Sequence, residues 1–317
     1  MKRFLILWLV VVSAWAVGRG ADVVKTTLDY AVTGSDTLRL DRYAAVRCTE
    51  APTRCMIFVF GGGFAGGERD NSEYLPFFNE MARSGYEVVS IDYRLGLRSV
   101  EAADLASPDR FAGRLGGAVS MAVEDLFTAT SFVLDHATDW NIDPRGIIVC
   151  GSSAGAITVL QAEYVLCSGQ PRPSSLPADF GYAGVISFAG AIFGLTPELQ
   201  WGEAPAPMLL FHGTNDSNVP YGVLRLGNVG FFGSESVAAS LRAIGSPYLF
   251  YSVAGADHSL ATSPMRDDVP VVKAFISQFV ADGARIMEQA DVTVIGSDTT
   301  RRQFTLMDYI KSNFPSR

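Results

Sequence analysis

The sequence predicts an α/β protein with a mostly parallel central sheet, helices on both faces and an N-terminal antiparallel hairpin. Two observations lead to this prediction. Apolar strand patterns alternate with amphipathic helix patterns along most of the chain, and two strand-like segments, residues 23–32 and 37–48, come first. With 317 residues, 48% of them hydrophobic, the chain can bury a sizeable core. We expect one domain over residues 22–282 and assign no role to the tail, residues 283–317.

The expected strands after the hairpin are short and continuously apolar, as strands buried on both faces are. They are "MIFVF" (56–60), "YEVVSIDY" (86–93), "GIIVCG" (146–151), "YAGVISFAG" (182–190), "PMLLFHG" (207–213) and "PYLFYSVAG" (247–255). The segments between them have apolar residues three and four positions apart, which predicts helices. They are residues 72–85, 116–136, 154–166 and 234–245, with a last helix over 269–280.

Residues 1–16 have the pattern of a cleaved signal peptide. Lys2 and Arg3 precede an apolar run that reaches about Val12, and Ala14–Ala16 forms a small-x-small cleavage site. The uncharged run is shorter than the roughly 18–20 residues that usually cross a membrane. We therefore expect an exported protein, periplasmic or secreted, with no stable membrane span in its mature form.

Export permits disulfide bonds. Cys48 and Cys55 flank a polar stretch between two strand patterns, so a hairpin could bring them together, and we predict a disulfide between them. Cys150 and Cys167 are expected as buried thiols. The cysteines and histidines show no metal-binding spacing, so no metal or cofactor is expected. A net charge of −8 without basic clusters argues against nucleic acid as a partner.

Residues 151–155 (Gly-Ser-Ser-Ala-Gly) lie between an expected strand and an expected helix and fit the pattern G-x-S-x-G. Small residues on either side let strand and helix approach closely, and the tight turn lifts the middle serine above the sheet. The helix N-terminus beside it favours developing negative charge. Ser153 is therefore the candidate nucleophile, and Ser152 the variable residue before it. The alternative is a Gly/Ser-rich turn without chemistry.

A nucleophilic serine needs a base, and the chain has three histidines. His136 lies on a helix before the candidate nucleophile. His212 ends an apolar strand, where a structural hydrogen bond is expected. His258 lies in a loop directly after a strand. From there it can reach across the end of the sheet, so we take His258 as the candidate base.

The acid that orients the base is expected between the serine and the histidine in the chain. Asp216 lies in the loop after "PMLLFHG", at the carboxyl end of that strand. A buried carboxylate there could fix the tautomer of His258 and stabilise its charged form. Asp257 is adjacent to His258, but consecutive side chains rarely face each other, so we prefer Asp216.

Three consecutive glycines, residues 61–63, follow the strand "MIFVF" directly. Their backbone N–H groups, together with that of Ala154, could form an oxyanion hole. The same region also fits G-x-G-x-x-G, and the next strand ends at Asp92, where a ribose-binding acid would fall. However, this strand follows a hairpin and its helix is delayed by a polar stretch. Nucleotide binding is the weaker interpretation.

At this point the chain resembles the α/β-hydrolases, and is similar to their exported carboxylesterase and feruloyl or acetyl-xylan esterase-like branch. The resemblance covers nearly all of the mature chain through "FGGGF", "SIDYRLG", "NIDPRGIIVCGSSAG", "FHGTNDSNVPY" and "GADH", in family order. It implies the α/β-hydrolase fold, with Gly62, Gly63 and Ala154 as the oxyanion donors.

The resemblance also implies that Asp92 and Arg94 are structural supports near the site. One position departs from the family pattern. Relatives commonly carry histidine before the three glycines, whereas this chain has Phe60. The glycine loop must therefore be supported differently.

We conclude that the sequence encodes a serine esterase for small or carbohydrate-linked acyl esters. The alternatives are a catalytically inactive binding module of the same fold and, less favoured, a peptidase or a nucleotide-binding oxidoreductase. Two inserts, residues 99–117 and 198–206, could overhang the site as a lid, although ordinary surface loops are equally compatible with their sequences. Phe64, Phe111 and Trp201 are the candidate walls of a substrate pocket. The acyl group, the alcohol and the oligomeric state are not predicted.

Overall fold

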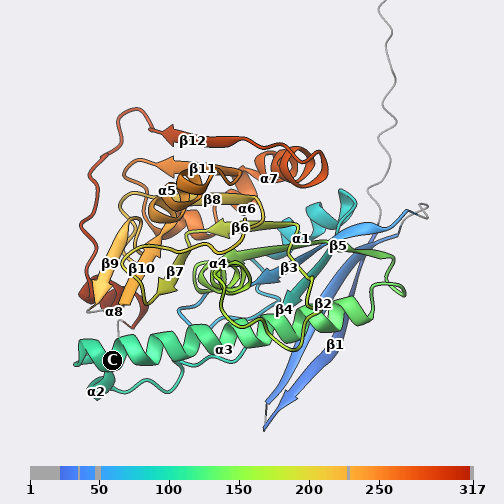
Figure 1. Ribbon diagram of the computed structural model, residues 1–317, viewed down its shortest axis with the longest axis horizontal. Coiled ribbons are helices and arrows are strands. Elements are labelled where there is room, and N and C mark those ends of the chain that lie inside the picture. Colours follow the sequence, from blue (N-terminus) through green and yellow to red (C-terminus); the bar gives the residue numbers. More distant parts are fainter. Residues whose placement is uncertain (1–21, 35, 47–50, 227–228, 315–317) are drawn as a thin grey trace, which may run out of the picture.

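A long twisted sheet runs through the centre of the protein (Figure 1). The computed structural model describes residues 22–34, 36–46, 51–226 and 229–314. The strands, in spatial order, are β1 (Val23–Thr33), β2 (Asp36–Ala45), β4 (Glu87–Ile91), β3 (Thr53–Val59), β5 (Ile142–Ser152), β6 (Gly184–Phe188), β8 (Met208–Gly213), β11 (Tyr248–Val253) and β12 (Met287–Val292). β1, β2 and β4 are antiparallel neighbours, and each further neighbouring pair is parallel. The predicted hairpin and the predicted mostly parallel sheet are both present.

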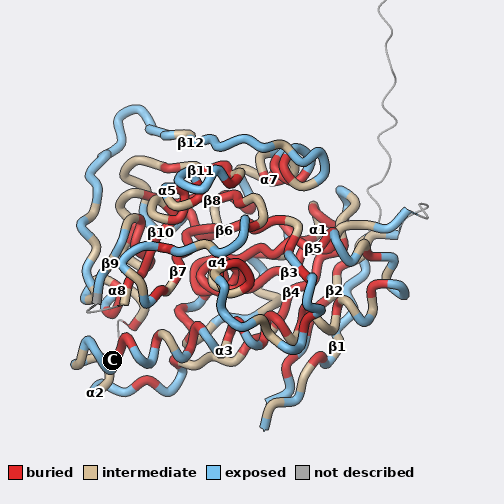
Figure 2. The backbone as a smooth tube through the Cα atoms, viewed as in Figure 1, coloured by how far each residue is buried: buried red, intermediate tan, exposed pale blue. Residues whose placement is uncertain are grey.

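Helices cover both faces of this sheet, as the apolar strands require. One face carries α3 (Pro108–Asp135), α4 (Ala154–Cys167) and α5 (Ser234–Ile244). The other face carries α1 (Leu75–Arg83), α6 (Pro264–Asp267), and α7 (Val269–Phe275) with its π-helical continuation Ile276–Ala281. Every residue of β4, β6 and β8 is buried, and Figure 2 shows the burial continuing into α4.

A second, smaller sheet lies at the carboxyl ends of the parallel strands (Figure 1). It contains β7 (Ala191–Gly194), β10 (Val229–Gly233) and β9 (Val223–Leu226), all antiparallel. β7 follows β6, and β9 and β10 follow β8, so this sheet is built from the loops that leave the carboxyl edge. Its strands have only four or five residues, which is too short for a periodic pattern to predict them.

The first predicted insert, residues 99–117, is not a loop. It contains the short helix α2 (Ala102–Leu105) and then the first turns of α3, so the expectation that this helix begins at residue 116 is wrong. Pro108 stands in the first turn, where its missing N–H costs nothing, and Phe111 and Leu115 continue the buried stripe at helical spacing.

α3 is long and apolar enough to cross a membrane by length and composition. More than half of its most apolar window, 56%, is instead buried inside the protein. α3 contacts α4 and β1, as a core helix does.

Part of the tail belongs to the main fold. β12 extends the sheet in parallel with β11, and α8 (Leu306–Asn313) returns to the carboxyl edge near the small sheet and the start of α3 (Figure 1). A capping box fixes the start of α8, because Thr305 and Asp308 each accept a hydrogen bond from the other's backbone N–H. The sheet therefore continues past residue 282.

No disulfide joins the cysteines of the described residues. Cys55 is a free thiol, fully buried in β3, and this burial raises its pKa. Its predicted partner, Cys48, lies outside the described residues, as does the proposed signal peptide of residues 1–16. Cys150 and Cys167 are free buried thiols, as expected.

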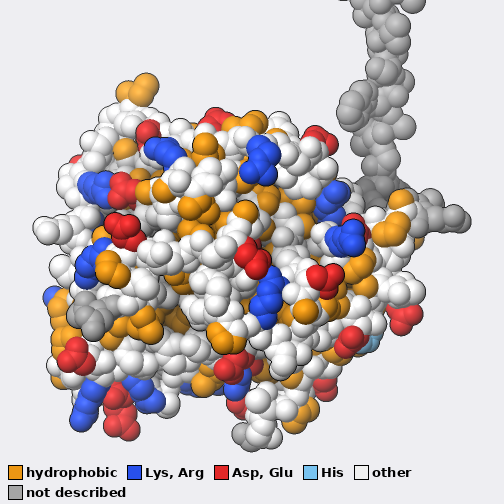
Figure 3. All heavy atoms as spheres, viewed as in Figure 1, with side chains coloured by type: hydrophobic (Ala, Val, Ile, Leu, Met, Phe, Trp, Pro, Cys, Tyr) orange, Lys and Arg blue, Asp and Glu red, His pale blue; other side chains and the backbone are white. Residues whose placement is uncertain are grey.

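Acidic and basic side chains are interspersed over the face seen in Figure 3, with apolar side chains between them. No single sign of charge gathers on that face. This pattern agrees with the modest net charge of −8 for 317 residues.

Candidate active site at the carboxyl edge of the sheet

Ser153 lies at the sharp turn between β5 and α4, with φ 51° and ψ −114°. A positive φ is rare for a residue with a side chain, and it persists only where the surroundings enforce it. Here two glycines enforce it. A Cβ on Gly155 would overlap the carbonyl oxygen of Val59, and a Cβ on Gly151 would overlap that of Gly155. The close approach of strand and helix thus turns the Ser153 side chain out of the sheet.

A continuous chain of hydrogen bonds links the three candidate residues. The Oγ of Ser153 lies 2.8 Å from the Nε2 of His258, and the Nδ1 of His258 lies 2.7 Å from the Oδ2 of Asp216. Since the carboxylate only accepts, Nδ1 carries a proton and Nε2 is left to accept the proton of Ser153. The structure brings together three residues from three separate loops.

Asp216 is a fully buried carboxylate with several donors. Its Oδ1 accepts the backbone N–H groups of Asn218 at 2.7 Å and Val219 at 3.0 Å. Burial acts to raise the pKa of Asp216, but its hydrogen bonds with His212 and His258 outweigh burial and hold that pKa well below its ordinary value. The carboxylate therefore stays ionised.

His212 is a second histidine at this carboxylate. Its Nε2 lies 3.3 Å from the Oδ2 of Asp216 and 3.3 Å from the carbonyl oxygen of Val219, and its Nδ1 lies 2.8 Å from the Oγ of Ser234. Both neighbours of Nε2 are acceptors, so Nε2 carries the proton and Nδ1 accepts from Ser234. His212 thus has the structural role expected for it, and that role is to hold the side chain of Asp216 in place. The sequence feature that points to this contact is that His212 lies four residues before Asp216.

The alternative candidates have other partners. The Oγ of Ser152 is buried and donates to the carbonyl oxygen of Ala261 at 2.8 Å. Asp257 accepts the backbone N–H of Ser259 at 3.0 Å and caps the short 3₁₀ helix His258–Ala261. His136 lies at the C-terminus of α3. None of them has a hydrogen bond with Ser153 or His258 among the described residues.

The glycine loop lies against Ser153. A Cβ on Gly61 would come within 3.1 Å of the Cβ of Ser153, and Gly62 and Gly63 both have positive φ, 131° and 61°. The N–H of Gly61 donates to the hydroxyl of Tyr74 at 3.3 Å, so it is already engaged. On the other side of Ser153, Ala154 opens α4 with an N–H that has no acceptor within the helix.

Phe60 supports the glycine loop. Its ring contacts that of Tyr93 at 4.5 Å between centroids, and the Tyr93 hydroxyl donates to the Phe60 carbonyl oxygen at 3.0 Å. A Cβ on Gly67 would collide with the Phe60 ring, so glycine there lets the loop fold over it. Aromatic packing thus supports the glycine loop at the position where the family pattern leads one to expect a histidine.

The contacts of Asp92 argue against nucleotide binding. Its carboxylate pairs with Arg69 at 2.8 Å and accepts the backbone N–H of Arg39 at 3.2 Å, which are structural contacts. Arg94 likewise pairs with the buried Asp125 at 2.8 Å. In addition, α1 begins only at Leu75, well after the glycines, whereas a dinucleotide site needs the glycines to open the helix.

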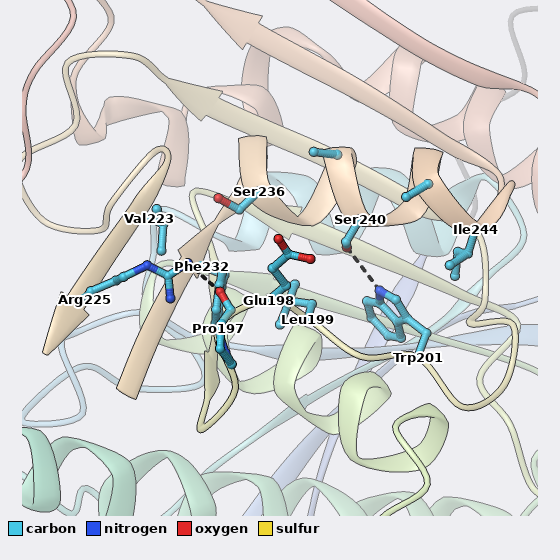
Figure 4. Close-up of a pocket in the computed structure, with 12 residues that line it drawn as sticks. Pro197, Glu198, Leu199, Trp201, Val223, Arg225, Phe232, Ser236, Ser240 and Ile244 are labelled. Atoms are coloured by element: carbon cyan, nitrogen blue, oxygen red, sulfur yellow. Dashed lines mark hydrogen bonds between the residues drawn. The ribbon is translucent and has the colours of Figure 1, made fainter. Parts of the chain in front are cut away.

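The three candidate pocket residues are dispersed. Phe64 is fully buried beside Tyr93, and Phe111 is buried against Tyr309 of α8. Trp201 lines a separate apolar cavity of about 330 Å³ beside α5, where its indole N–H donates to Ser240 at 3.1 Å (Figure 4). The second predicted insert thus forms part of this cavity, which Ser153 does not line.

Part of the chain is similar in sequence to known esterases. No family model matches the chain. Fumonisin B1 esterase of Sphingopyxis macrogoltabida is 30% identical over 129 residues, 39% of this chain and 22% of that protein. Esterase B1 of Culex pipiens is 27% identical over 124 residues, 39% of this chain and 21% of that protein. The chain thus spans about a fifth of the length of the curated relatives it matches.

Solved structures match over far more of the chain. A thermophilic esterase of Thermogutta terrifontis superposes with a TM-score of 0.58 at 20% identity, over 82% of this chain and 93% of that one. Esterase 2 of the same organism, phosphonylated by cyclosarin, superposes with a TM-score of 0.55 at 20% identity, over 85% and 97%. The fold is that of the α/β-hydrolases.

The close approach of β5 and α4 at the Ser153 turn leads to a prediction about stability. Gly155→Ala forces a methyl group into the Val59 carbonyl and should lower the free energy of unfolding by about 2 kcal/mol or more. Gly113→Ala, at an exposed position in α3 with open space around it, should instead raise it by up to about 1 kcal/mol. Urea unfolding of both variants measures the difference. Equal free energies of unfolding for the two variants would show that β5 and α4 can move apart at this turn without loss of stability.

Proposed function

We propose that this protein is a serine carboxylesterase that cleaves small or carbohydrate-linked acyl esters. The observation that carries the proposal is the hydrogen-bonded series Ser153–His258–Asp216 beside the glycine loop. It supplies a nucleophile, a base in the correct tautomer and a buried acid. The named esterases among the sequence relatives and the solved structures support the same reaction class.

The geometry implies a two-step reaction. Nε2 of His258 takes the proton of Ser153 as Oγ attacks the ester carbonyl carbon, forming a tetrahedral intermediate. The histidine then returns that proton to the departing alcohol, which leaves an acyl group on Ser153. Water, deprotonated by the same Nε2, attacks the acyl carbon, and the carboxylic acid departs as Ser153 regains its proton.

Two further groups stabilise the charges that develop. The ionised Asp216 stabilises the imidazolium of His258 through the 2.7 Å hydrogen bond at Nδ1. The backbone N–H groups of Gly62, Gly63 and Ala154 are proposed to bind the oxyanion, because the glycine loop reaches Ser153 at Gly61 and Ala154 opens α4 directly after it. The N-terminal end of the helix adds favourable partial charge.

The nucleophile is tested by a pair of adjacent serines. Ser153→Ala should lower kcat on p-nitrophenyl and acetylated-sugar esters by about 10⁴-fold or more, and a fluorophosphonate probe should label Ser153. Ser152→Ala loses the hydrogen bond to Ala261 and the contact with the Tyr74 hydroxyl, neither of which involves Ser153 or His258, and should retain substantial activity. An intact protein that hydrolyses no ester and takes no probe would favour the inactive binding module. Labelling at Ser152 would refute the assignment of the nucleophile.

The acid is tested by two neighbouring aspartates. Asp216→Asn keeps the size of the side chain but can donate to Nδ1, which permits the wrong tautomer of His258, so kcat should fall roughly 10²–10⁴-fold with KM little changed. Asp257→Asn alters only the cap of the 3₁₀ helix and should cost far less. The two kcat values on one activated ester decide between them, and the opposite ranking would reverse the assignment.

Export remains a second part of the proposal, and its support is the N-terminal sequence pattern alone. If residues 1–16 are a cleaved signal peptide, the full chain expressed in a secreting host should appear outside the cytoplasm with Val17 as its first residue. Intact mass and N-terminal sequencing measure this. A protein that keeps Met1 and remains in the cytoplasm would contradict it.

A further inference from the structure

We propose that the C-terminal segment, residues 297–314, is a brace that positions Asp216 and the glycine loop for catalysis, with Arg302 and Asn313 as its positioning residues. This inference rests on the proposed esterase function. The segment contacts the acid loop, defined as Thr214–Val219, on both sides of Asp216.

The brace holds the acid loop through three hydrogen bonds to its carbonyl oxygens. The backbone N–H of Arg302 donates to Thr214 at 3.1 Å, and its Nε donates to Asn215 at 3.4 Å. The Nδ2 of Asn313 donates to Asn218 at 3.2 Å. The first two contacts precede Asp216 in the chain and the third follows it. The acid is therefore held from both sides.

The contact from Asn313 acts on the peptide group that binds the acid. The carbonyl oxygen of Asn218 and the N–H of Val219 belong to one peptide unit, and that N–H donates to the Oδ1 of Asp216 at 3.0 Å. Polarising the carbonyl strengthens the N–H as a donor, because hydrogen bonds in a chain reinforce one another. Asn313 is thus one hydrogen bond removed from the carboxylate.

The same side chain lies next to the glycine loop. A Cβ on Gly63 would lie 3.0 Å from the Oδ1 of Asn313 and 3.4 Å from its Cβ. The orientation of the amide is set by its partners, since Nδ2 faces the carbonyl oxygens of Asn218 and Tyr309. Oδ1 therefore faces Gly63. One side chain bridges the loop of the acid and the loop of the proposed oxyanion donors.

The core contacts of α8 make this bridge stiff. Tyr309 is almost completely buried, and its ring contacts those of Phe111 and Phe231 at 5.6 and 6.0 Å between centroids. Phe314 contacts Phe111 from the next turn at 6.0 Å. Phe111 comes from α3 and Phe231 from β10, so two elements pack against the helix.

Charge pairs fix the approach to α8. Arg302 pairs with Asp308 of the capping box at 2.9 Å. Arg301 pairs with Glu235 of α5 and stacks over the ring of Tyr221 at 4.9 Å. Exposed ion pairs contribute little singly, but together they align the segment along the acid loop.

The expected effect is on catalysis rather than on substrate binding. Loops are the least rigid parts of a fold, and a misplacement of about 1 Å can cost about 10²-fold in rate. Within the described part of the chain, the hydrogen bonds of Asn313 and Arg302 go to the backbone of the acid loop and to α8. Substituting either residue should therefore lower kcat and leave KM nearly unchanged.

The test compares Asn313→Ala with Lys311→Ala, an exposed position on the same helix. Asn313→Ala should lower kcat about 10- to 100-fold, keep KM within a small factor, and shift or broaden the downfield proton resonance of the His258 Nδ1–H. Lys311→Ala should match the wild type in all three measurements. A folded Asn313→Ala protein with wild-type kcat and an unchanged resonance would overturn the brace.

A double-mutant cycle shows whether Asn313 acts through the acid. In an Asp216→Asn background the loss from Asn313→Ala should largely disappear, since the carboxylate that it positions is gone. If Asn313→Ala lowers kcat as much in the Asp216→Asn background as in the wild type, Asn313 does not act through Asp216. If Asn313→Ala does not fold, Arg302→Gln tests the other side of the loop, with the same fall in kcat expected.

The failure of the brace and the failure of the esterase proposal are distinguishable. A wild-type chain that is inactive on esters and unlabelled at Ser153 overturns the proposed function, and the brace with it. A wild-type chain that is active, with Ser153→Ala inactive and Asn313→Ala fully active, overturns the brace alone.

Discussion

The close approach of β5 and α4 is the constraint on which the site depends. Gly151 and Gly155 let the backbones meet where a Cβ would overlap a carbonyl oxygen. The chain can then pass from strand to helix only through a residue with positive φ, and that residue is Ser153 at 51°. The side chain consequently leaves the sheet beside the first free N–H groups of a helix. The positive φ of Ser153, the direction of its side chain and its place beside the helix N-terminus thus have one cause, the close approach of β5 and α4.

The buried carboxylate of Asp216 is the second requirement. Burying an unpaired charge away from water costs free energy, and a buried carboxylate stays ionised only when its oxygens accept hydrogen bonds. Two backbone N–H groups and two imidazoles meet that need, and hydrogen bonding to the charged form lowers the pKa of Asp216 despite burial. His212 matters here because it is a second donor to Oδ2, the same carboxylate oxygen that His258 binds.

Much of this arrangement was predictable because its determinants are local. The strand–glycine–serine–helix pattern, the strands β3, β4, β5, β6, β8 and β11, and the loops that follow them all leave a mark in a few consecutive residues. The start of α3 was missed because Gly116 and Gly117 interrupt the helical signal, and the short strands of the small sheet were missed because they carry too few residues for a period.

The tail was unpredictable for a different reason. Asn313 and Asn218 are 95 positions apart, and nothing in the sequence around either residue signals the other. Phe60 shows the same limit, since the sequence exposed the departure from the family pattern but not the ring of Tyr93 that compensates for it. Contacts between distant segments are set by packing of the whole domain, which single-sequence patterns do not encode.

Hydrogen bonds tie the loops of the site to other segments of the chain. Ser152, beside the nucleophile, donates to Ala261 in the 3₁₀ helix that begins with His258. Asn313 joins the acid loop to the glycine loop. Each tie crosses between segments that the sheet only brings near to one another. Since a hydrogen-bond series of three side chains loses its function when any member shifts, the alignment of the loops depends on these crossing contacts as much as on the sheet beneath them.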